Sequence, residues 1–279
     1  MRATLRPLRT VVLTLATALL VATGLVSQPA GSPVSVAYAG VAASGRAGIT
    51  SMPALEPGRP LVGKVVVLDA GHQLGNHNYP AQINRLVPAG GFRKQCNTTG
   101  TATNGGYPEA TFAFRVTRLL KARLEAAGAR VILTRSTNRQ DRWGPCVDVR
   151  GRAGNRAEAD LKISLHGDGN VGGGPGFHVI APTDRRPWTH DIFDASRVAA
   201  KSVRRSFVRA GLPVAGYIAG GDGLDFRSDL ATLNLSDVPT VMVECGNMRS
   251  AADARRMASR GGQAAYADAL ARAVRRYLS

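Results

Sequence analysis

The segment Lys64–Asp69 (KVVVLD) sets four apolar residues in a row between two charged ones, and the polar turn Ala70-Gly71-His72 follows at once. A short, uninterrupted apolar run bounded by turn-forming residues is typical of a strand buried on both faces. We therefore predict an interior strand over 64–69 and a polar site where this strand ends.

From this segment onward, strands and helices alternate. Pro108 opens an apolar stretch of helical period that ends near Ala127, and Gly128 suits the position after the helix. Further strands are predicted at Arg130–Thr134, Leu161–Leu165, Gly176–Ala181 and Pro239–Glu244, and further helices near 148–159, 190–210 and 251–278. This alternation predicts an α/β fold: a single domain with a mostly parallel central sheet flanked by helices on both faces.

The stretch from Leu74 to Tyr107 interrupts the alternation, because it is rich in Asn, Gly and Pro and has no clear periodicity. Connections of this length are usually functional or mobile. We predict a flap beside the active site, with a hairpin in it.

The three cysteines are Cys96, Cys146 and Cys245. The first two lie in polar loops, whereas Cys245 follows an apolar strand. We predict a Cys96–Cys146 disulfide and a buried free thiol at Cys245; the alternative is three unpaired thiols.

The N-terminus has the parts of a secretory signal peptide. Three arginines (Arg2, Arg6 and Arg9) precede an apolar stretch over 10–26, and the small-residue site Ala37-Tyr38-Ala39 follows. We predict a signal peptide over 1–39, a linker or pro-segment over 40–62 and a catalytic domain over 63–279. Cleavage nearer Ala30 and an uncleaved membrane anchor are the alternatives.

The formal net charge is +17, and loss of the three N-terminal arginines leaves +14. Such a charge predicts attraction to a polyanion. An exported protein rarely meets nucleic acid, so we predict the cell envelope as the partner, in the periplasm or the cell wall. We expect no nucleic-acid partner, no stable membrane span after processing, and a monomer.

Three of the predicted strands end near a potential metal ligand or catalytic acid: His72, His166 and Glu244. Glu109 begins the helix after the flap. In α/β sheets the carboxyl ends of the strands form the ligand site, so these four residues can converge there. Two histidines and a carboxylate hold many catalytic zinc ions, and a remaining carboxylate can act as general acid and base.

Each of these residues has a structural alternative when it is taken alone. His72 and His166 stand in Gly-containing turns, and Glu109 can compensate a helix dipole. Glu244 ends an apolar run, where a buried carboxylate needs a partner. Among the remaining histidines, we expect His178 to be structural, His190 to cap or precede a helix, and His77 to be a candidate substrate contact. We expect Asp69 and Asp168 to orient the ligands, and a plain turn-forming role is the alternative.

Four ordered segments carry a family resemblance: LDAGHQ, PEATFAFRVTRLLKARLEAAGARVILTR, RGRAGNRAEADLKISLHGD and VPTVMVECGNMRSAADA. Together they cover nearly all of 63–279 and resemble the zinc-dependent N-acetylmuramoyl-L-alanine amidases of the Amidase_3 family. The resemblance implies one Zn²⁺ per chain held by His72, Glu109 and His166, with Glu244 as the catalytic acid and base. It also implies peptidoglycan or muropeptide fragments as substrate, cut between N-acetylmuramic acid and L-alanine.

Other functions stay open on the residues alone. A zinc peptidase that cuts within the stem peptide would use the same four side chains. A catalytically inactive wall-binding protein would use the positive charge and need none of them. A glycan-cleaving enzyme would need two facing acids and no metal.

Overall fold

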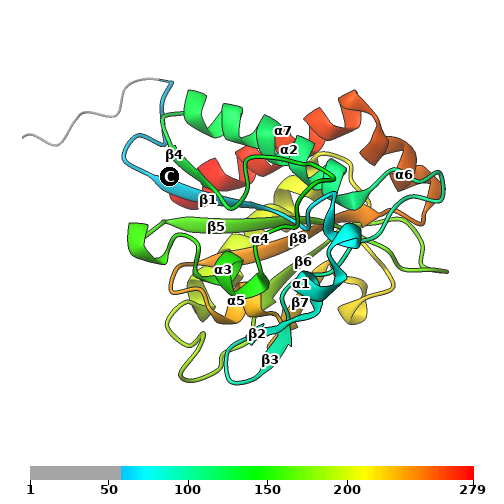
Figure 1. Ribbon diagram of the computed structural model, residues 1–279. Coiled ribbons are helices and arrows are strands. Elements are labelled where there is room, and N and C mark those ends of the chain that lie inside the picture. The colour runs from blue at the N-terminus through cyan, green and yellow to red at the C-terminus, as the bar shows by residue number, and fades with distance from the viewer. Residues whose placement is uncertain (1–57) are drawn as a thin grey trace, which may run out of the picture. The chain divides into compact units, whose positions relative to one another are not determined.

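The computed structural model describes residues 58–279, so the predicted signal peptide and most of the predicted linker lie outside the described residues. A six-stranded sheet in the order β4-β1-β5-β8-β6-β7 forms the centre of the domain (Figure 1). The strands are β1 (Val65–Ala70), β4 (Arg130–Leu133), β5 (Leu161–Asp168), β6 (His178–Pro182), β7 (Leu224–Arg227) and β8 (Thr240–Asn247). All neighbours run parallel except β6 and β8, so the predicted mostly parallel sheet is confirmed.

Long helices cover one face of the sheet and short ones the other. The long helices α2 (Glu109–Ala126), α4 (Phe193–Arg209) and α7 (Arg260–Leu278) share the main apolar core with the strands, and α6 (Ala251–Ala258) packs beside α7. The opposite face carries α3 (Val147–Arg152) and α5 (Ala231–Asn234). Helices therefore flank the sheet on both faces, as predicted.

Alternating side chains along the two central strands explain this arrangement. Ile163, Leu165, Val241 and Val243 enter the core beneath the long helices. The residues that alternate with them, Ser164 and His166 in β5 and Met242 and Glu244 in β8, therefore face the side of α3 and α5. Because α3 and α5 are short, that face keeps room for a pocket.

The predicted flap contains the hairpin that the sequence suggested. Strands β2 (Leu86–Pro88) and β3 (Arg93–Gln95) pair antiparallel, and α1 (Pro80–Asn84) precedes them. A disulfide joins Cys96 to Cys146, and Cys245 is a buried free thiol, so both cysteine predictions are confirmed. The 3-10 turns are η1 (Asn76–Asn78), η2 (Asn155–Ala157) and η3 (Ala219–Gly221).

Some elements differ from the prediction. The helical stretch over 251–278 is two helices that meet at Ser259. Strand β7 and helix α5 were not predicted, because four polar-rich residues each are too few for a periodic signal. Within residues 58–279, no helix has the length and apolar character needed to cross a membrane.

Candidate metal centre and active site

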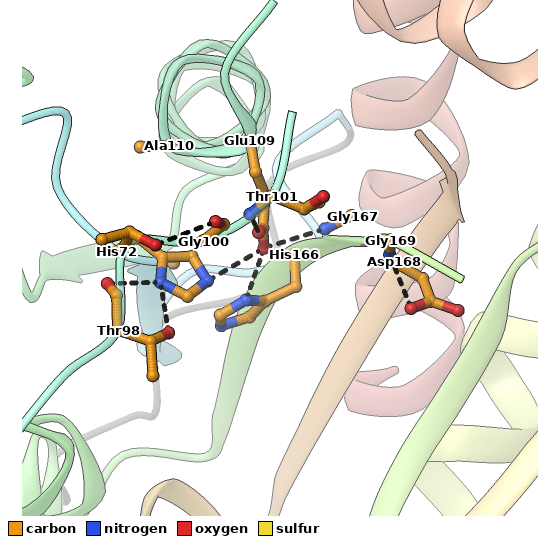
Figure 2. Close-up of polar contacts among 12 residues, drawn as sticks. His72, Thr98, Gly100, Thr101, Glu109, Ala110, His166, Gly167, Asp168 and Gly169 are labelled. Carbon is orange, nitrogen blue, oxygen red and sulfur yellow. Dashed lines mark hydrogen bonds and ion pairs between the residues drawn. The ribbon is translucent and has the colours of Figure 1, made fainter. Parts of the chain in front are cut away.

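Three potential metal ligands meet at the carboxyl ends of β1 and β5. His72 follows β1, Glu109 is the first residue of α2, and His166 lies within β5. The Oε1 atom of Glu109 lies 2.8 Å from Nδ1 of His166 and 3.1 Å from Nε2 of His72. Figure 2 shows both rings turned toward this carboxylate, and one ligand atom from each residue lies within 4.8 Å of the others. The structure thus brings together the three residues that the sequence proposed as ligands.

The flap holds the His72 ring. Nδ1 of His72 lies 3.1 Å from the backbone oxygen of Thr98, and because a carbonyl only accepts, Nδ1 carries the hydrogen (Figure 2). The other nitrogen, Nε2, then faces Glu109. A backbone carbonyl that orients the second ring nitrogen is the usual support of a metal-binding histidine. Thr98 was not predicted, because no local pattern marks it.

His72 also has an unusual backbone. Its φ is 54°, in the left-handed region that residues other than glycine rarely adopt. The Arg150 guanidinium donates to the His72 backbone oxygen over 2.7 Å and holds this conformation. Strained backbone of this kind concentrates at functional sites, where the surrounding structure stabilises it.

Glu109 is nearly completely buried and amply hydrogen-bonded. Its Oε2 accepts from the Thr101 amide over 2.8 Å, and its Oε1 accepts from the Gly167 amide over 3.2 Å. Burial alone would raise the pKa of this carboxyl, but His72 and His166 hold the pKa well below its usual range. Glu109 is therefore an ionised, oriented carboxylate.

Two glycines allow the ligands to pack this closely. A Cβ on Gly71 would lie 2.5 Å from Cε1 of the His166 ring. A Cβ on Gly100 would lie 2.9 Å from Oε2 of Glu109 and 2.9 Å from Cδ2 of His72. The flap thus packs directly against His72 and Glu109, and only a hydrogen atom fits at these two glycines.

The donor set fits a zinc ion. Two imidazoles and one carboxylate, with further positions left for water or substrate, form the ligand set of many catalytic zinc sites. The Glu109 carboxylate is ionised, and the His72 tautomer leaves the lone pair of Nε2 available to a metal ion. The donor atoms of the three residues also lie close to one another.

Glu244 lies in the same pocket, next to His166. In the parallel pairing of β5 and β8, His166 and Glu244 are partners, so their side chains leave the same face of the sheet. The Oε2 atom of Glu244 is buried and has no hydrogen-bond partner among residues 58–279. Burial and the nearby carboxylates of Glu109 and Asp168 raise the pKa of Glu244 well above its usual range. The pocket measures about 380 Å³.

A buried ion pair supports the site from below. Asp69 accepts from Ser164 over 2.6 Å and from Thr134 over 2.5 Å, and it pairs with Arg150. Arg150 in turn holds the backbone of His72. Asp69 thus acts on His72 through Arg150. The sequence did not predict the role of Arg150, because Asp69 and Arg150 are 81 positions apart.

The other polar candidates have different surroundings. His77 is exposed in η1 and does not line the pocket. His178 is buried in β6, where its backbone stands opposite that of Glu244 in the antiparallel pairing with β8. His190 contacts Asp184 over 2.8 Å shortly before α4. Asp168 lines the pocket and accepts from the Gly169 amide over 2.6 Å.

Fold and site together define the class of the protein: an α/β protein whose strand ends carry a group of residues suited to a metal ion. The model of the Amidase_3 family, N-acetylmuramoyl-L-alanine amidase, matches residues 66–276. The chain therefore belongs to this family of amide-hydrolysing enzymes.

Individual relatives agree with this assignment. The chain is 41% identical over 222 residues to an N-acetylmuramoyl-L-alanine amidase of Mycobacterium tuberculosis, a match that covers 78% of this chain and 88% of the relative. The crystal structure of the amidase Ami1 from Mycobacterium smegmatis is 39% identical with a TM-score of 0.72, and covers 78% of this chain and 98% of its own. The apo Ami1 structure from Mycobacterium abscessus is 41% identical with the same TM-score, and covers 78% and 100%.

Proposed function

We propose that this protein is an exported, zinc-dependent amidase that hydrolyses the bond between N-acetylmuramic acid and L-alanine during cell-wall remodelling or recycling. One observation carries the proposal. The buried Glu244 carboxyl, with no partner for its Oε2 in the described chain, shares a pocket with the His72, Glu109 and His166 cluster. A binding protein has no use for such an acid, whereas amide hydrolysis requires one.

In this proposal His72, Glu109 and His166 hold the ion. A zinc ion in such a ligand set polarises a carbonyl group and makes a water molecule more acidic. Glu244 accepts a proton from the attacking water and later donates it to the leaving nitrogen of L-alanine. A raised pKa suits both roles, because it makes the carboxylate a stronger base toward water and keeps the proton available for the leaving nitrogen.

The proposed location follows from residues outside the described part of the chain. The basic and apolar N-terminus supports export, with residues 1–39 as signal peptide, 40–62 as linker and 63–279 as catalytic domain. The net charge of +14 that remains after loss of residues 1–39 supports residence beside the anionic cell envelope, in the periplasm or the cell wall, and we expect a monomer there.

Mass spectrometry of a muramoyl peptide after incubation with the purified protein tests the proposal. We expect free peptide with an L-alanine N-terminus, and no product after treatment with a chelator. Glu244→Gln should lower kcat by at least about a hundredfold, because it removes the proton carrier. It should leave one zinc bound per chain, since Glu244 is not among the proposed ligands.

Other products would point to other functions. Cleavage within the peptide would favour the zinc peptidase, and cleavage of the glycan would exclude the metal-dependent scheme. Bound zinc without any product would favour the wall-binding protein. A Glu244→Gln variant with unchanged kcat would show that another group carries the proton.

A further inference from the structure

The pocket that contains the candidate metal ligands is also lined by basic side chains. Among residues 58–279, two lysine or arginine side chains line it, Lys94 and Arg150. Arg150 is buried and donates to Asp69 and to the backbone oxygens of Ala70, His72 and Pro145. Its charge is therefore engaged by the protein. Lys94 remains as the cation available to a ligand in this pocket.

Lys94 lies in strand β3 of the hairpin, and its side chain is 39% exposed. Its ammonium donates to the backbone oxygen of Asp229 over 2.7 Å and lies 3.5 Å from Oδ2 of the Asp229 carboxylate. That carboxylate already receives a two-pronged contact from Arg227, 2.8 Å at each oxygen, and Arg227 also lies 3.9 Å from Asp225. An ammonium has three donors. Lys94 therefore keeps one N–H without an acceptor among residues 58–279.

The hairpin does not depend on Lys94 for its position. The Asn234 amide donates to the backbone oxygen of Ala89 over 2.9 Å, and Arg185 donates to that of Gly90 over 2.7 Å. The disulfide at Cys96 fixes the end of β3. Lys94 is thus an exposed cation on an otherwise fastened support.

Apolar side chains also line the pocket. They come from α3, α5 and β8 and include Val147, Ala231 and Met242. Met242 stands two residues before Glu244 on the same face of β8, about 7 Å along the strand. A ligand that carries an amide, a small apolar group and an anion within the span of this pocket would match its lining.

We propose that Lys94 is a specificity-determining residue, which selects stem peptides that carry a free carboxylate close to the scissile amide. This inference rests on the proposed amidase function. The ammonium donates to the carboxylate of the peptide, while the apolar wall receives the methyl group of the alanine at the cleavage site. A carboxamide at the same position accepts from Lys94 without the charge and binds more weakly.

Four substrates test the inference: N-acetylmuramoyl-L-alanyl-D-glutamate, its α-amide, its γ-amide and its diamide. A charge-assisted hydrogen bond predicts a kcat/KM for the diacid about tenfold above that for the diamide. The two monoamides identify the carboxylate that Lys94 binds. In Lys94→Met the ratio of diacid to diamide should fall to about one, because the diacid loses a charge-assisted hydrogen bond and the diamide only a weaker neutral one.

Two further variants serve as controls. Lys94→Arg keeps the charge and should keep the preference. Arg93→Met removes a cation from the neighbouring position of β3, which does not line the pocket, and should also keep it. Lys94→Gln removes the charge but retains a donor for Asp229, so it repeats the test if the Met variant does not fold.

Several results would overturn the inference. Equal kcat/KM values of the wild type for all four substrates would show that no carboxylate is selected. An equal loss on every substrate in Lys94→Met would show that Lys94 only supports the hairpin. If the wild type cleaves none of the four, the proposed amidase function fails and this inference falls with it.

Discussion

Gly100 illustrates how single residues set the geometry of the candidate site. Its φ of +77° is in the left-handed region, and its hydrogen atom faces both Glu109 and His72. Gly106, in the same flap, has a similar φ of +82° but open space where a Cβ would lie. The two glycines therefore share the backbone requirement and differ only in their surroundings.

This difference gives a prediction about the metal. Gly100→Ala should weaken zinc binding by at least about tenfold, because the new methyl group displaces two proposed ligands. Changes in residues that orient metal ligands typically lower the affinity for the metal by about 10- to 100-fold. Gly106→Ala should lower the free energy of unfolding only by the backbone strain of about 1–2 kcal/mol, and it should bind zinc like the wild type. Titration with a competing chelator measures both affinities. Equal affinities for the two variants would contradict the role assigned to Gly100.

At the scale of elements, the junction of α6 and α7 shows a local signal that periodicity does not reveal. The Ser259 hydroxyl accepts from the Gly262 amide over 3.0 Å and caps α7. Ser250 occupies the corresponding position before α6, yet its side chain makes no capping hydrogen bond. The capping hydroxyl at Ser259 thus favours a new helix where the apolar pattern alone predicts a continuous one.

Ser259→Ala should lower the free energy of unfolding by about 1 kcal/mol, the usual contribution of a capping hydroxyl. Ser250→Ala is the matched control and should change it by less than about 0.5 kcal/mol, since no cap is lost. Urea unfolding monitored by circular dichroism measures both values. A loss at position 250 as large as that at 259 would show that capping is not the cause.

The disulfide connects two elements that the sequence separates by 50 residues. It joins the end of β3 to the start of α3, and Asn97 and Val147, the residues after its two cysteines, both line the pocket. In the chain-entropy model, closing a loop of this length stabilises the folded state by about 4 kcal/mol.

The double variant Cys96→Ala/Cys146→Ala should therefore unfold at a lower urea concentration, with a loss of up to about 4 kcal/mol. Cys245→Ala leaves the cross-link intact and should lose less, as expected for one buried small side chain. Urea midpoints of the oxidised proteins make the comparison. Similar midpoints for the wild type and the double variant would mean that the cross-link does not constrain the unfolded chain.

At the scale of the whole molecule, a polar network between the sheet and α3 contains a buried lysine whose charge affects the stability of the fold. Lys162 is completely buried, and its ammonium donates to the backbone oxygens of Arg150 and Gly151. Burial lowers its pKa to about 7, although the charges of Asp69 and Asp237 act in the opposite direction. The free energy of folding therefore depends on whether this one group is charged.

The sign of the pH dependence follows from the direction of the shift. Between pH 7 and 10.5 the unfolded chain holds a proton on Lys162 that the folded chain has released, so stability rises with pH in that range. From pH 6 to pH 9 the free energy of unfolding should therefore increase by about 2–3 kcal/mol through this group. Lys162→Met lacks this gain, so its stability relative to the wild type should fall by that amount over the same range. Urea unfolding at both pH values checks it, and parallel pH profiles would contradict it.

The sequence by itself determined the strands, the long helices and the residues at their ends. Apolar runs such as Lys64–Asp69 have few conformations that bury them, and parallel strands place their carboxyl ends at one edge. His72, His166 and Glu244 therefore had to approach one another, and the cysteine pairing followed from the character of the surrounding loops. These features depend on patterns within a few residues of each other.

The tertiary structure decided what depends on contacts between distant segments. Only the fold reveals that β6 runs antiparallel to β8, that Thr98 orients His72 and that Arg150 supports it. It also brings Lys94 to the pocket, 135 positions away from its partner Asp229. The physical reason is that a polar loop residue carries no periodic signal of its own. Its partners are fixed by how strands and helices pack, and that packing is a property of the whole chain.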